Sequence, residues 1–403
     1  MWLRCTLGIA LALTATMVSG CSPTYKPSAS SLPSIRQSSG AGTSANDVGC
    51  STAGASGPSL THVRTAMTAV PGSPFGVVTT ANGRWSFVST SSSGVTSSTG
   101  LIVVLANRAS SSIIDFQVPI TGMPLGEALT NDGRYLLVAD DTGIVVLDTA
   151  RLESGGDSAV GTLREVVGGG AIEVAVSPND RFAFVTLEDS AEIAVFNLAQ
   201  ALPDGFGLQD FVGMIPLGLA PVGMAVSPNG QWLYVTSEGP VQGHGTLSVI
   251  NLSEAETDPG DSVVSSVIAG CSPVRVIVSS NGQTVWVTAR GSDDLLGFSE
   301  SSLVSDPSHA LVADVQIGPA PVGLSIVSNG TRIVVADSNR FGTAGSANLA
   351  VVDTEAALAR KSALLGYVPA GLFPREMALH GNELLVTNYS SGQLEALETN
   401  TLP

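Results

Sequence analysis

The segment PVGMAVSPNGQWLYVTS (221–237) decides the fold of this 403-residue chain. Two apolar runs, VGMAVS (222–227) and QWLYVTS (231–237), flank the short turn PNG (228–230). Asn-Gly between alternating apolar runs is the strongest short-range signal for a β-hairpin, because both residues tolerate a positive φ. The segment therefore predicts two antiparallel strands joined by a tight turn.

The same pattern occurs six more times along the chain. The other copies span residues 74–90, 124–140, 171–187, 273–289, 321–337 and 374–388. Equivalent turn residues, from Gly83 to Gly381, are separated by 50, 47, 50, 52, 48 and 51 residues. A fixed period of this size, with strand-type sequence inside each unit, indicates a propeller or a solenoid.

Each unit contains four candidate strands, so we expect an all-β, seven-bladed β-propeller with four-stranded antiparallel blades. The last unit ends before its fourth strand, and THVRTAMTAV (61–70) looks like the fourth strands of the other units. We expect this N-terminal strand to complete the last blade and close the ring. The alternative is an open solenoid. Such a solenoid requires polar capping repeats at its ends, and we see none in the sequence.

The repeat P-x-G-x-A-V-S-P-N-G-x-x-L-Y-V-T-N resembles that of the YVTN-type β-propeller family. Residues 221–237 depart from it only at the last position, and Leu385-Val386-Thr387-Asn388 keeps the terminal Asn. The resemblance covers about residues 59–403. It implies a seven-bladed propeller that is often exported. Relatives include secreted binding proteins, lactonase-like hydrolases and haem-carrying domains, so the resemblance leaves the activity open.

The N-terminal sequence predicts export. Residues 1–20 have a positive start and a short apolar stretch, as in a signal peptide, and Val18-Ser19-Gly20-Cys21 resembles a bacterial lipobox. Residues 21–58 then form a lipidated Cys plus a flexible Ser/Gly/Pro-rich tether, and 59–403 form the propeller. The alternative is ordinary cleavage nearby, with Cys21 an incidental thiol.

These features predict an exported lipoprotein of the cell envelope, periplasmic or on the outer surface, with a secreted protein as the alternative. Its membrane contact would be the N-terminal lipid anchor, and we expect a monomer. The net charge of −17 and the lack of any Lys/Arg-rich stretch argue against a nucleic-acid partner. A protein or a small polar ligand on the channel face is the expected partner.

Cys50 and Cys271 are the two cysteines left beyond the signal and the lipobox, and an exported chain could pair them. Cys50 precedes the first expected strand by 11 residues, which span at most about 36–40 Å. Cys271 lies between units four and five, far around the ring from the N-terminal strand. This geometry argues against the disulfide.

Aligning the repeats exposes one exceptional position, the third residue of each P-x-G element. Four units have glycine there, whereas units three, five and seven have Glu173, Arg275 and Glu376. The first strand of each blade should line the central channel, so these charges are expected to converge at its mouth. They could form a stabilising ion-pair network or splay into solvent. Alternatively, they could bind a polar ligand through Arg275, with a carboxylate of raised pKa as base.

Further polar residues are expected on the same face, just after the second strands. The candidates for ligand binding there are Asp140, Glu238, Arg290, Asp337, Asn388 and Tyr389. No HExxH, GxSxG, Walker-type, paired CxxC or C-x-x-C-H motif occurs, so we expect no metal and no cofactor.

The sequence therefore favours a binding or interaction module of the cell envelope. The alternative is a lactonase-like hydrolase at the channel mouth, with Arg275 polarising a carbonyl and Glu173 or Glu376 activating water. Single-stranded nucleic-acid binding is a third hypothesis, which the aromatic content of 5% and the net charge oppose.

Overall fold

The computed structural model describes residues 50, 54–91, 99–108, 111–141, 143–164, 169–240, 243–342 and 347–403. The expected signal peptide, Cys21 and most of the tether lie outside the described residues. The described residues belong to one compact unit. Within them, no helix combines the length and the apolar character needed to cross a membrane.

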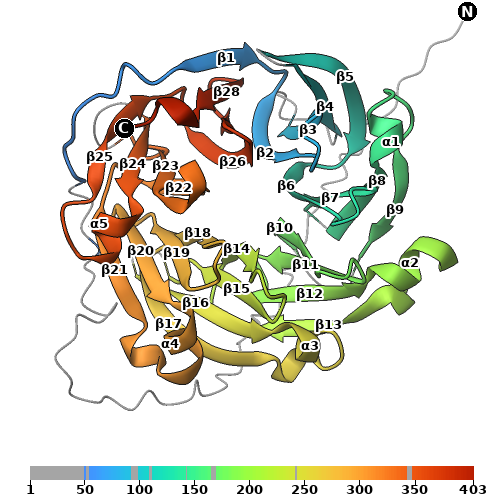
Figure 1. Cartoon of the computed structure of the whole chain (residues 1–403). Coiled ribbons are helices and arrows are strands. Elements are labelled where there is room, and N and C mark those ends of the chain that lie inside the picture. The colour runs from blue at the N-terminus through green and yellow to red at the C-terminus, as the bar shows by residue number, and fades with distance from the viewer. Residues whose placement is uncertain are drawn as a thin grey trace, which may run out of the picture. The chain divides into compact units, whose positions relative to one another are not determined.

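Seven four-stranded antiparallel sheets form the blades of a β-propeller, as the sequence predicts (Figure 1). Blades 1 and 2 contain β2 (Ser73–Thr79), β3 (Trp85–Ser91), β4 (Thr99–Arg108), β5 (Ser111–Thr121), β6 (Pro124–Leu129), β7 (Tyr135–Asp140), β8 (Gly143–Asp148) and β9 (Ala159–Leu163). Blades 3 and 4 contain β10 (Ala171–Val176), β11 (Phe182–Leu187), β12 (Glu192–Asn197), β13 (Phe211–Pro216), β14 (Pro221–Val226), β15 (Trp232–Ser237), β16 (His244–Asn251) and β17 (Val263–Cys271).

Blades 5 and 6 follow with β18 (Pro273–Val278), β19 (Thr284–Ala289), β20 (Asp294–Ser299), β21 (Leu311–Gln316), β22 (Pro321–Val327), β23 (Arg332–Asp337), β24 (Asn348–Asp353) and β25 (Leu364–Pro369). Blade 7 contains β26 (Pro374–His380), β27 (Glu383–Asn388) and β28 (Gln393–Glu398) from the end of the chain and β1 (Thr65–Ala69) from its beginning. β1 pairs with β28 over five residues, from Thr65 opposite Leu397 to Ala69 opposite Gln393. The expected closure by the N-terminal strand is therefore present.

Short helices connect the third and fourth strands of blades 2 to 6, where the sequence analysis expected only polar loops. They are α1 (Thr149–Leu152), α2 (Leu198–Asp204), α3 (Leu252–Ala255), α4 (Glu300–Ser305) and α5 (Thr354–Leu358). The last residue of each third strand caps the helix with its side chain; these residues are Asp148, Asn197, Asn251, Ser299 and Asp353. The 3₁₀ turns are η2 (Leu208–Asp210), η3 (Pro259–Asp261), η4 (Pro307–His309), η5 (Ser328–Gly330) and η6 (Thr399–Thr401).

The tight turns form as predicted, but in blade 4 only one of the two residues Asn229 and Gly230 adopts the positive φ that the hairpin signal implied. In blade 4 the Gly230 amide donates to the Ser227 carbonyl, and only Gly230 has a positive φ, of 70°. The Asn229 side chain instead accepts hydrogen bonds from the Ser227 hydroxyl (2.6 Å) and the Gln231 amide (3.0 Å). Asn is favoured here because its side chain holds the turn.

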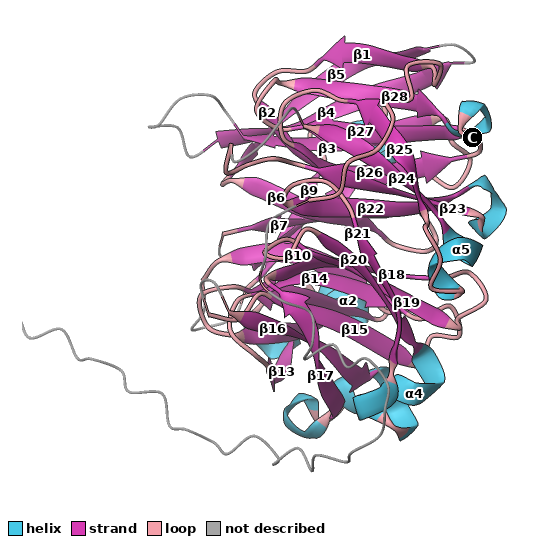
Figure 2. Ribbon diagram, turned by 90° about the vertical axis from the view of Figure 1, so that its left-hand side faces the viewer, coloured by secondary structure: helices cyan, strands magenta, loops and turns pink. Residues whose placement is uncertain are grey.

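The hydrophobic core lies between the blades, which stand side by side when the ring is seen from its edge (Figure 2). One cluster joins Tyr234 and Leu247 of blade 4 to Val285 and Phe298 of blade 5, and similar clusters join the other neighbours. Because each blade packs against its neighbour, the hydrophobic core is distributed around the ring between the blades.

Hydroxyl groups near the ends of the second strands also link neighbouring blades. Thr288 accepts a hydrogen bond from the Arg275 amide (3.1 Å) and donates one to the Val322 carbonyl of the next blade (2.7 Å). Thr387 donates to the Phe75 carbonyl at 3.0 Å and so joins blade 7 to blade 1. The Thr of the repeated V-T element therefore fixes the backbone beside the channel.

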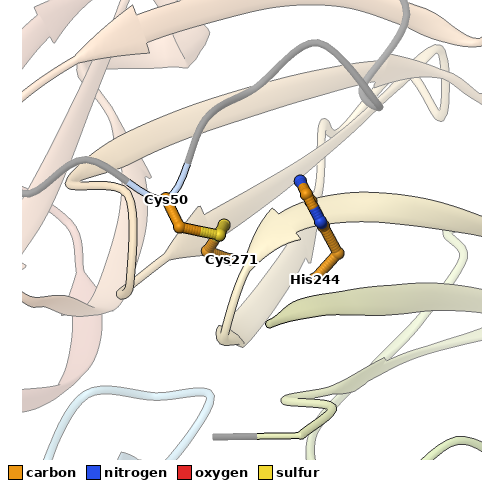
Figure 3. Close-up of side chains that lie close together, drawn as sticks. All are labelled: Cys50, His244 and Cys271. Carbon is orange, nitrogen blue, oxygen red and sulfur yellow. A yellow bond between two sulfur atoms is a disulfide. The ribbon is translucent and has the colours of Figure 1, made fainter. Parts of the chain in front are cut away.

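The structure joins Cys50 and Cys271 in a disulfide, with their Cα atoms 5.4 Å apart, so the expectation against this pairing was wrong (Figure 3). The N-terminal segment reaches β1 along the outer, fourth strands of the preceding blades. It passes Ile317 of blade 5 and Tyr367 of blade 6 on its way to β1, and it hydrogen-bonds to the backbone of both. We call residue 50 and residues 54–64 the N-terminal strap; because the strap passes blade 5 before it reaches β1, Cys50 lies close enough to Cys271 to pair with it.

Candidate functional site

Glu173 on β10, Arg275 on β18 and Glu376 on β26 meet at the centre of the ring. Arg275 Nη2 lies 2.6 Å from Glu376 Oε1 and 3.2 Å from Glu173 Oε2, and Arg275 Nε donates to Glu376 Oε1 at 2.8 Å. These residues belong to blades 5, 7 and 3, which are not neighbours, so their contacts cross the axis. The alignment of third positions thus identified residues that the structure brings together.

Backbone hydrogen bonds hold the chain in place at each of the three charged residues. The amides of Glu173, Arg275 and Glu376 donate to the hydroxyls of Thr186, Thr288 and Thr387. In every blade the first strand carries a register irregularity beside this position. Such bulges re-aim side chains, and here the irregularity accompanies side chains that face the axis.

Glycine at the third position of the other units allows the next blade to approach. A Cβ atom at Gly223 would lie 2.3 Å from the Val274 carbonyl oxygen, and one at Gly323 would lie 1.8 Å from that of Arg375. The first strands are therefore too close at these positions for any other residue.

Arg275 is committed to protein groups. Besides the two carboxylates, its Nη1 donates to the Val222 carbonyl (2.5 Å) and the Val274 carbonyl (3.3 Å). Burial lowers the pKa of Arg275, but Glu376 and Glu173 outweigh it and raise that pKa above its ordinary value. Arg275 therefore remains a cation at the centre of an ion-pair network, the structural alternative that the sequence left open.

Glu173 is held as the proton-bearing member of the network. Burial raises its pKa to about 8, against the opposing effect of Arg275 and with a further increase from Glu376. Its side chain is only 16% exposed. At neutral pH most molecules therefore carry a neutral Glu173 beside the Arg275–Glu376 ion pair.

Arg375 is a functional candidate that the sequence analysis missed. Its guanidinium carbon lies 3.6 Å from the ring centroid of Phe75, and its Nε has no hydrogen-bond partner in the described part of the chain. The nearest carboxylate oxygen, Glu376 Oε1, is 3.9 Å away and already bonded to Arg275. Burial and Arg275 lower the pKa of Arg375 to about 9, so it is still charged at neutral pH.

The signal for Arg375 was present one residue before the third position. The other six units carry Phe75, Leu125, Ile172, Val222, Val274 and Val322 there. A cation at a position that is otherwise apolar is informative, because a buried charge is costly unless it is paired.

A series of stacked arginine and aromatic side chains runs outward from Arg375. We call it the arginine–aromatic ladder, and it consists of Phe75, Arg375, Phe373, Arg340, Phe341 and Arg290. Successive guanidinium-to-ring distances beyond the first are 5.6, 5.4, 5.5 and 5.7 Å. Arg340 and Phe341 are exposed, whereas Arg375 and Arg290 on either side of them are mostly covered, with side chains 14% and 12% exposed. The ladder therefore meets the surface at Arg340 and Phe341.

Three of the predicted ligand-binding residues lie beside the ladder. Arg290 and Glu238 form an ion pair (2.5 Å), and Tyr389 packs on Phe373 with ring centroids 5.4 Å apart. Burial raises the pKa of Glu238, and Arg290 opposes that effect. These contacts place Glu238, Arg290 and Tyr389 around the ladder, as their predicted face requires.

Asp140, Asp337 and Asn388 occupy a different setting. Their side chains face Gly122, Gly318 and Gly371, in the loops that lead into the first strands of their own blades. All three are buried. The three side chains therefore pack directly against these loops and lie apart from the arginine–aromatic ladder.

Glu127 is a second residue that the sequence analysis missed. It lies on β6, is 6% exposed, and neither of its carboxyl oxygens has a hydrogen-bond partner among the described residues. Burial raises its pKa well above the ordinary value, and Glu173 adds to the effect. Burial therefore favours the neutral form of the Glu127 carboxyl group beside the channel charges.

Comparisons with known proteins establish the fold. No protein-family profile and no curated protein matches the chain. Among solved structures it is similar to Kuenenia stuttgartiensis hydrazine synthase, at 16% identity and a TM-score of 0.65, covering 83% of this chain and 97% of that one. It is also similar to the Swd1 β-propeller domain of Myceliophteria thermophila, at 13% identity and a TM-score of 0.61, covering 83% and 99%.

A third similar structure is a functionally unknown protein from Desulfotomaculum acetoxidans, at 13% identity and a TM-score of 0.56, covering 78% of this chain and 95% of that one. Identities this low carry no information about activity, because one fold supports many functions. The sheets and these likenesses together identify the chain as a seven-bladed β-propeller.

Proposed function

We propose that this chain is an exported, lipid-anchored, YVTN-type propeller that binds a small carboxylate at the inner end of the arginine–aromatic ladder. The observation that carries the proposal is the largely covered guanidinium of Arg375, whose buried Nε lacks a hydrogen-bond partner in the described residues. Burying a cation without a hydrogen-bonded partner is unfavourable. A ligand carboxylate would supply the missing acceptor.

The charges near the axis favour an anion. Burial raises the pKa of Glu173 to about 8 and that of Glu127 well above its ordinary value, which favours the neutral form of both carboxyl groups, whereas Arg275 and Arg375 keep their positive charges. The two guanidinium charges are then less fully compensated, so an anionic ligand is favoured. A guanidinium can also donate two parallel hydrogen bonds to the two oxygens of a carboxylate, an arrangement that an ammonium group cannot form.

The aromatic rings define the rest of the ligand's environment. Phe75 and Phe373 lie on the Arg375 guanidinium, and Tyr389 packs behind Phe373. Arg375 itself is 14% exposed, so its open edge remains in contact with solvent. These walls suit a carboxylate with a compact apolar body, because burying apolar surface adds about 25 cal/mol per Å².

A carboxylate panel tests the proposal. We expect small apolar carboxylates to raise the melting temperature of the full chain in a concentration-dependent way, and the matching amides to have no effect. Arg375→Met should remove the response because it keeps the stem and deletes the guanidinium. Arg64→Met is the matched control, since Arg64 forms an exposed ion pair with Glu398. Equal responses in Arg375→Met and wild type would contradict the proposal.

One feature favours the hydrolase alternative: Glu173 has a pKa of about 8, close to the neutral pH at which a general base would act. Against it, the donors of Arg275 that would polarise a carbonyl are bonded to Val222, Val274 and Glu376. A panel of lactones and esters decides between the two functions. Turnover that Glu173→Gln abolishes would favour the hydrolase, whereas its absence alongside carboxylate binding favours the binding module.

Export and anchoring rest on the sequence of residues 1–21. We expect a chain expressed in a bacterial host to incorporate labelled fatty acid at Cys21 and to fractionate with membranes. Cys21→Ser should lose both properties while keeping the carboxylate response. Membrane association of Cys21→Ser equal to that of wild type would contradict the anchor.

A further inference from the structure

Cys50, His244 and Cys271 lie together at one end of blade 4, outside the site described above. Their two Sγ atoms and one imidazole nitrogen all lie within 4.8 Å of one another. Figure 3 shows the His244 ring beside the disulfide, with the three side chains arriving from separate parts of the chain. We expected no metal from the sequence, because no metal-ligand motif such as HExxH or a paired CxxC occurs in it.

The sheet brings His244 and Cys271 to the same side. They are directly opposite each other in the pairing of β16 with β17, and opposed residues of antiparallel strands project from one face. The backbone of Cys271 is further held by the Gly291 amide, which donates to its carbonyl at 2.8 Å. Two of the three groups are therefore positioned by regular structure.

The N-terminal strap brings the third group. The Ala55 amide donates to the Ile317 carbonyl (2.7 Å), and the Leu60 amide donates to the Tyr367 carbonyl (2.7 Å). The Tyr367 hydroxyl also donates to the Ala55 carbonyl at 2.7 Å. These bonds hold residues 55–60 against blades 5 and 6 independently of the disulfide, so Cys50 would stay tethered five residues from this attachment after the S–S bond breaks.

We propose that, when the disulfide is reduced, Cys50, Cys271 and His244 form a binding site for one thiophilic closed-shell cation, Zn²⁺ or Cu⁺. A dithiol reductant would give two electrons and two protons to the S–S bond and become a disulfide itself, leaving two thiols. The cation would then replace the thiol protons and accept the two thiolates and the imidazole as ligands.

The donor set selects this class of ion. Thiolate sulfur favours Cu⁺ and Zn²⁺, whereas Ca²⁺ and Mg²⁺ require oxygen ligands. Two thiolates and one imidazole complete a trigonal Cu⁺ site, or leave the fourth position of a tetrahedral Zn²⁺ site for water. Cys50 and His244 are exposed and Cys271 is buried, so an ion could reach the cluster from solvent and bind against a fixed ligand.

The oxidised protein, with its disulfide, and the reduced, metal-bound protein would crosslink the same elements. In both forms the strap is joined to the end of β17, and only the reduced, metal-free protein lacks this crosslink. The site would therefore let the strap stay attached in both oxidising and reducing surroundings. This inference is independent of the carboxylate site.

The test uses the full chain, reduced and freed of reductant without oxygen, with Co²⁺ as a spectroscopic probe. We expect one Co²⁺ per chain with thiolate-to-cobalt charge-transfer absorption, displaced by Zn²⁺. A second titration measures Cu⁺ against a coloured Cu⁺ chelator and tells which ion the site prefers. Cys50→Ser and Cys271→Ser should abolish the absorption.

His244→Ala isolates the imidazole, because it leaves both thiols in place. We expect its affinity for the probe to fall at least about tenfold, while thiol counting shows that it still forms the disulfide. His62→Ala, an exposed strap residue outside the cluster, should match wild type. The proposal is overturned if reduced wild type shows no charge-transfer absorption, or if His244→Ala binds as tightly as wild type.

Discussion

Glu127 and Arg375 are each the only charged residue at a repeat position that is apolar in the other units. The six residues equivalent to Glu127 are Val77, Val174, Met224, Val276, Leu324 and Met377. Comparing third positions alone found Glu173, Arg275 and Glu376, and the same comparison one residue earlier and later would have found the other two. Their pairing could not be predicted, because it depends on which blades face each other across the axis.

We expect Glu127→Met to stabilise the protein. Methionine is the natural residue at two equivalent positions, and the substitution removes a buried carboxyl group whose oxygens have no hydrogen-bond partner among the described residues. An unsatisfied buried polar group costs about 1–3 kcal/mol. Urea unfolding at pH 8 should show a gain of this size. Asp115→Asn on the exposed face of β5 serves as the control, and a loss of stability in Glu127→Met would show that the carboxyl group is used.

Glu173 predicts a specific dependence of stability on pH. Its pKa rises from 4.5 in the unfolded chain to about 8 in the folded protein, so between these values the folded state binds more protons. Stability contributed by this group is complete below pH 4.5 and is lost as the pH rises toward about 8, by at most about 1.4 kcal/mol per pH unit. Glu173→Gln should remove that part of the slope.

Urea unfolding of wild type and Glu173→Gln at several pH values from 5 to 8 provides the measurement. The difference in unfolding free energy between the two proteins should change steadily in favour of the variant as the pH rises. Asp115→Asn again supplies an exposed control. A constant difference across this range would mean that Glu173 is ionised throughout and that the guanidinium charges at the axis are more fully compensated.

At the scale of elements, the repeat predicted the strands, but it did not predict the helices between them or the disulfide. The two strands expected at 222–227 and 231–237 agree with β14 and β15 within one residue at each end. The helices α1 to α5 were missed although their caps, such as Asp148 and Asn251, stand before them in the sequence. The disulfide was misjudged because straight-line reach was estimated without knowing that the strap follows blades 5 and 6.

The hydroxyl links between blades give a test at this scale. Thr387 accepts the Glu376 amide (2.9 Å) and donates to the Phe75 carbonyl (3.0 Å) across the closure between blades 7 and 1. Thr387→Val keeps the shape and strand propensity but leaves both backbone groups without this partner. We expect a loss of about 1–3 kcal/mol in unfolding free energy.

Thr65→Val, on the exposed part of β1, provides a matched substitution without an interblade hydroxyl link. It should leave stability nearly unchanged. Ala139 and Ala336 stand at the equivalent positions of blades 2 and 6, so the ring tolerates some missing links. Equal stability of Thr387→Val and Thr65→Val would show that the closure does not depend on this hydroxyl.

At the scale of the whole molecule, closure joins the two ends of the described chain. The number of blades and the contribution of β1 to the last blade were predictable, because period and strand type are encoded locally. We expect a chain beginning at Cys50 to unfold cooperatively, and one beginning at Val70 to lose cooperative unfolding because β28 loses its partner β1 and blade 7 is left with an open edge. Circular dichroism during thermal unfolding compares the two.

The net charge of −17 also acts at this scale, and it opposes the binding of anions. The proposal is local: at physiological salt, charges beyond about 8 Å are largely screened, whereas Arg375 is buried beside Arg275. Function could not be predicted from the bulk charge for this reason. The sequence indicated where to look, and the state of each group at the axis required the structure.

The most direct measurement is a crystal structure of the full propeller with the carboxylate that stabilises it most. The account predicts the carboxylate oxygens within hydrogen-bonding distance of the Arg375 guanidinium, with the ligand body against Phe75 or Phe373. It also predicts that Arg275 keeps its contacts with Glu376 and the Val222 carbonyl. A ligand bound away from Arg375, or an Arg375 that pairs with another protein carboxylate and excludes the ligand, would contradict it.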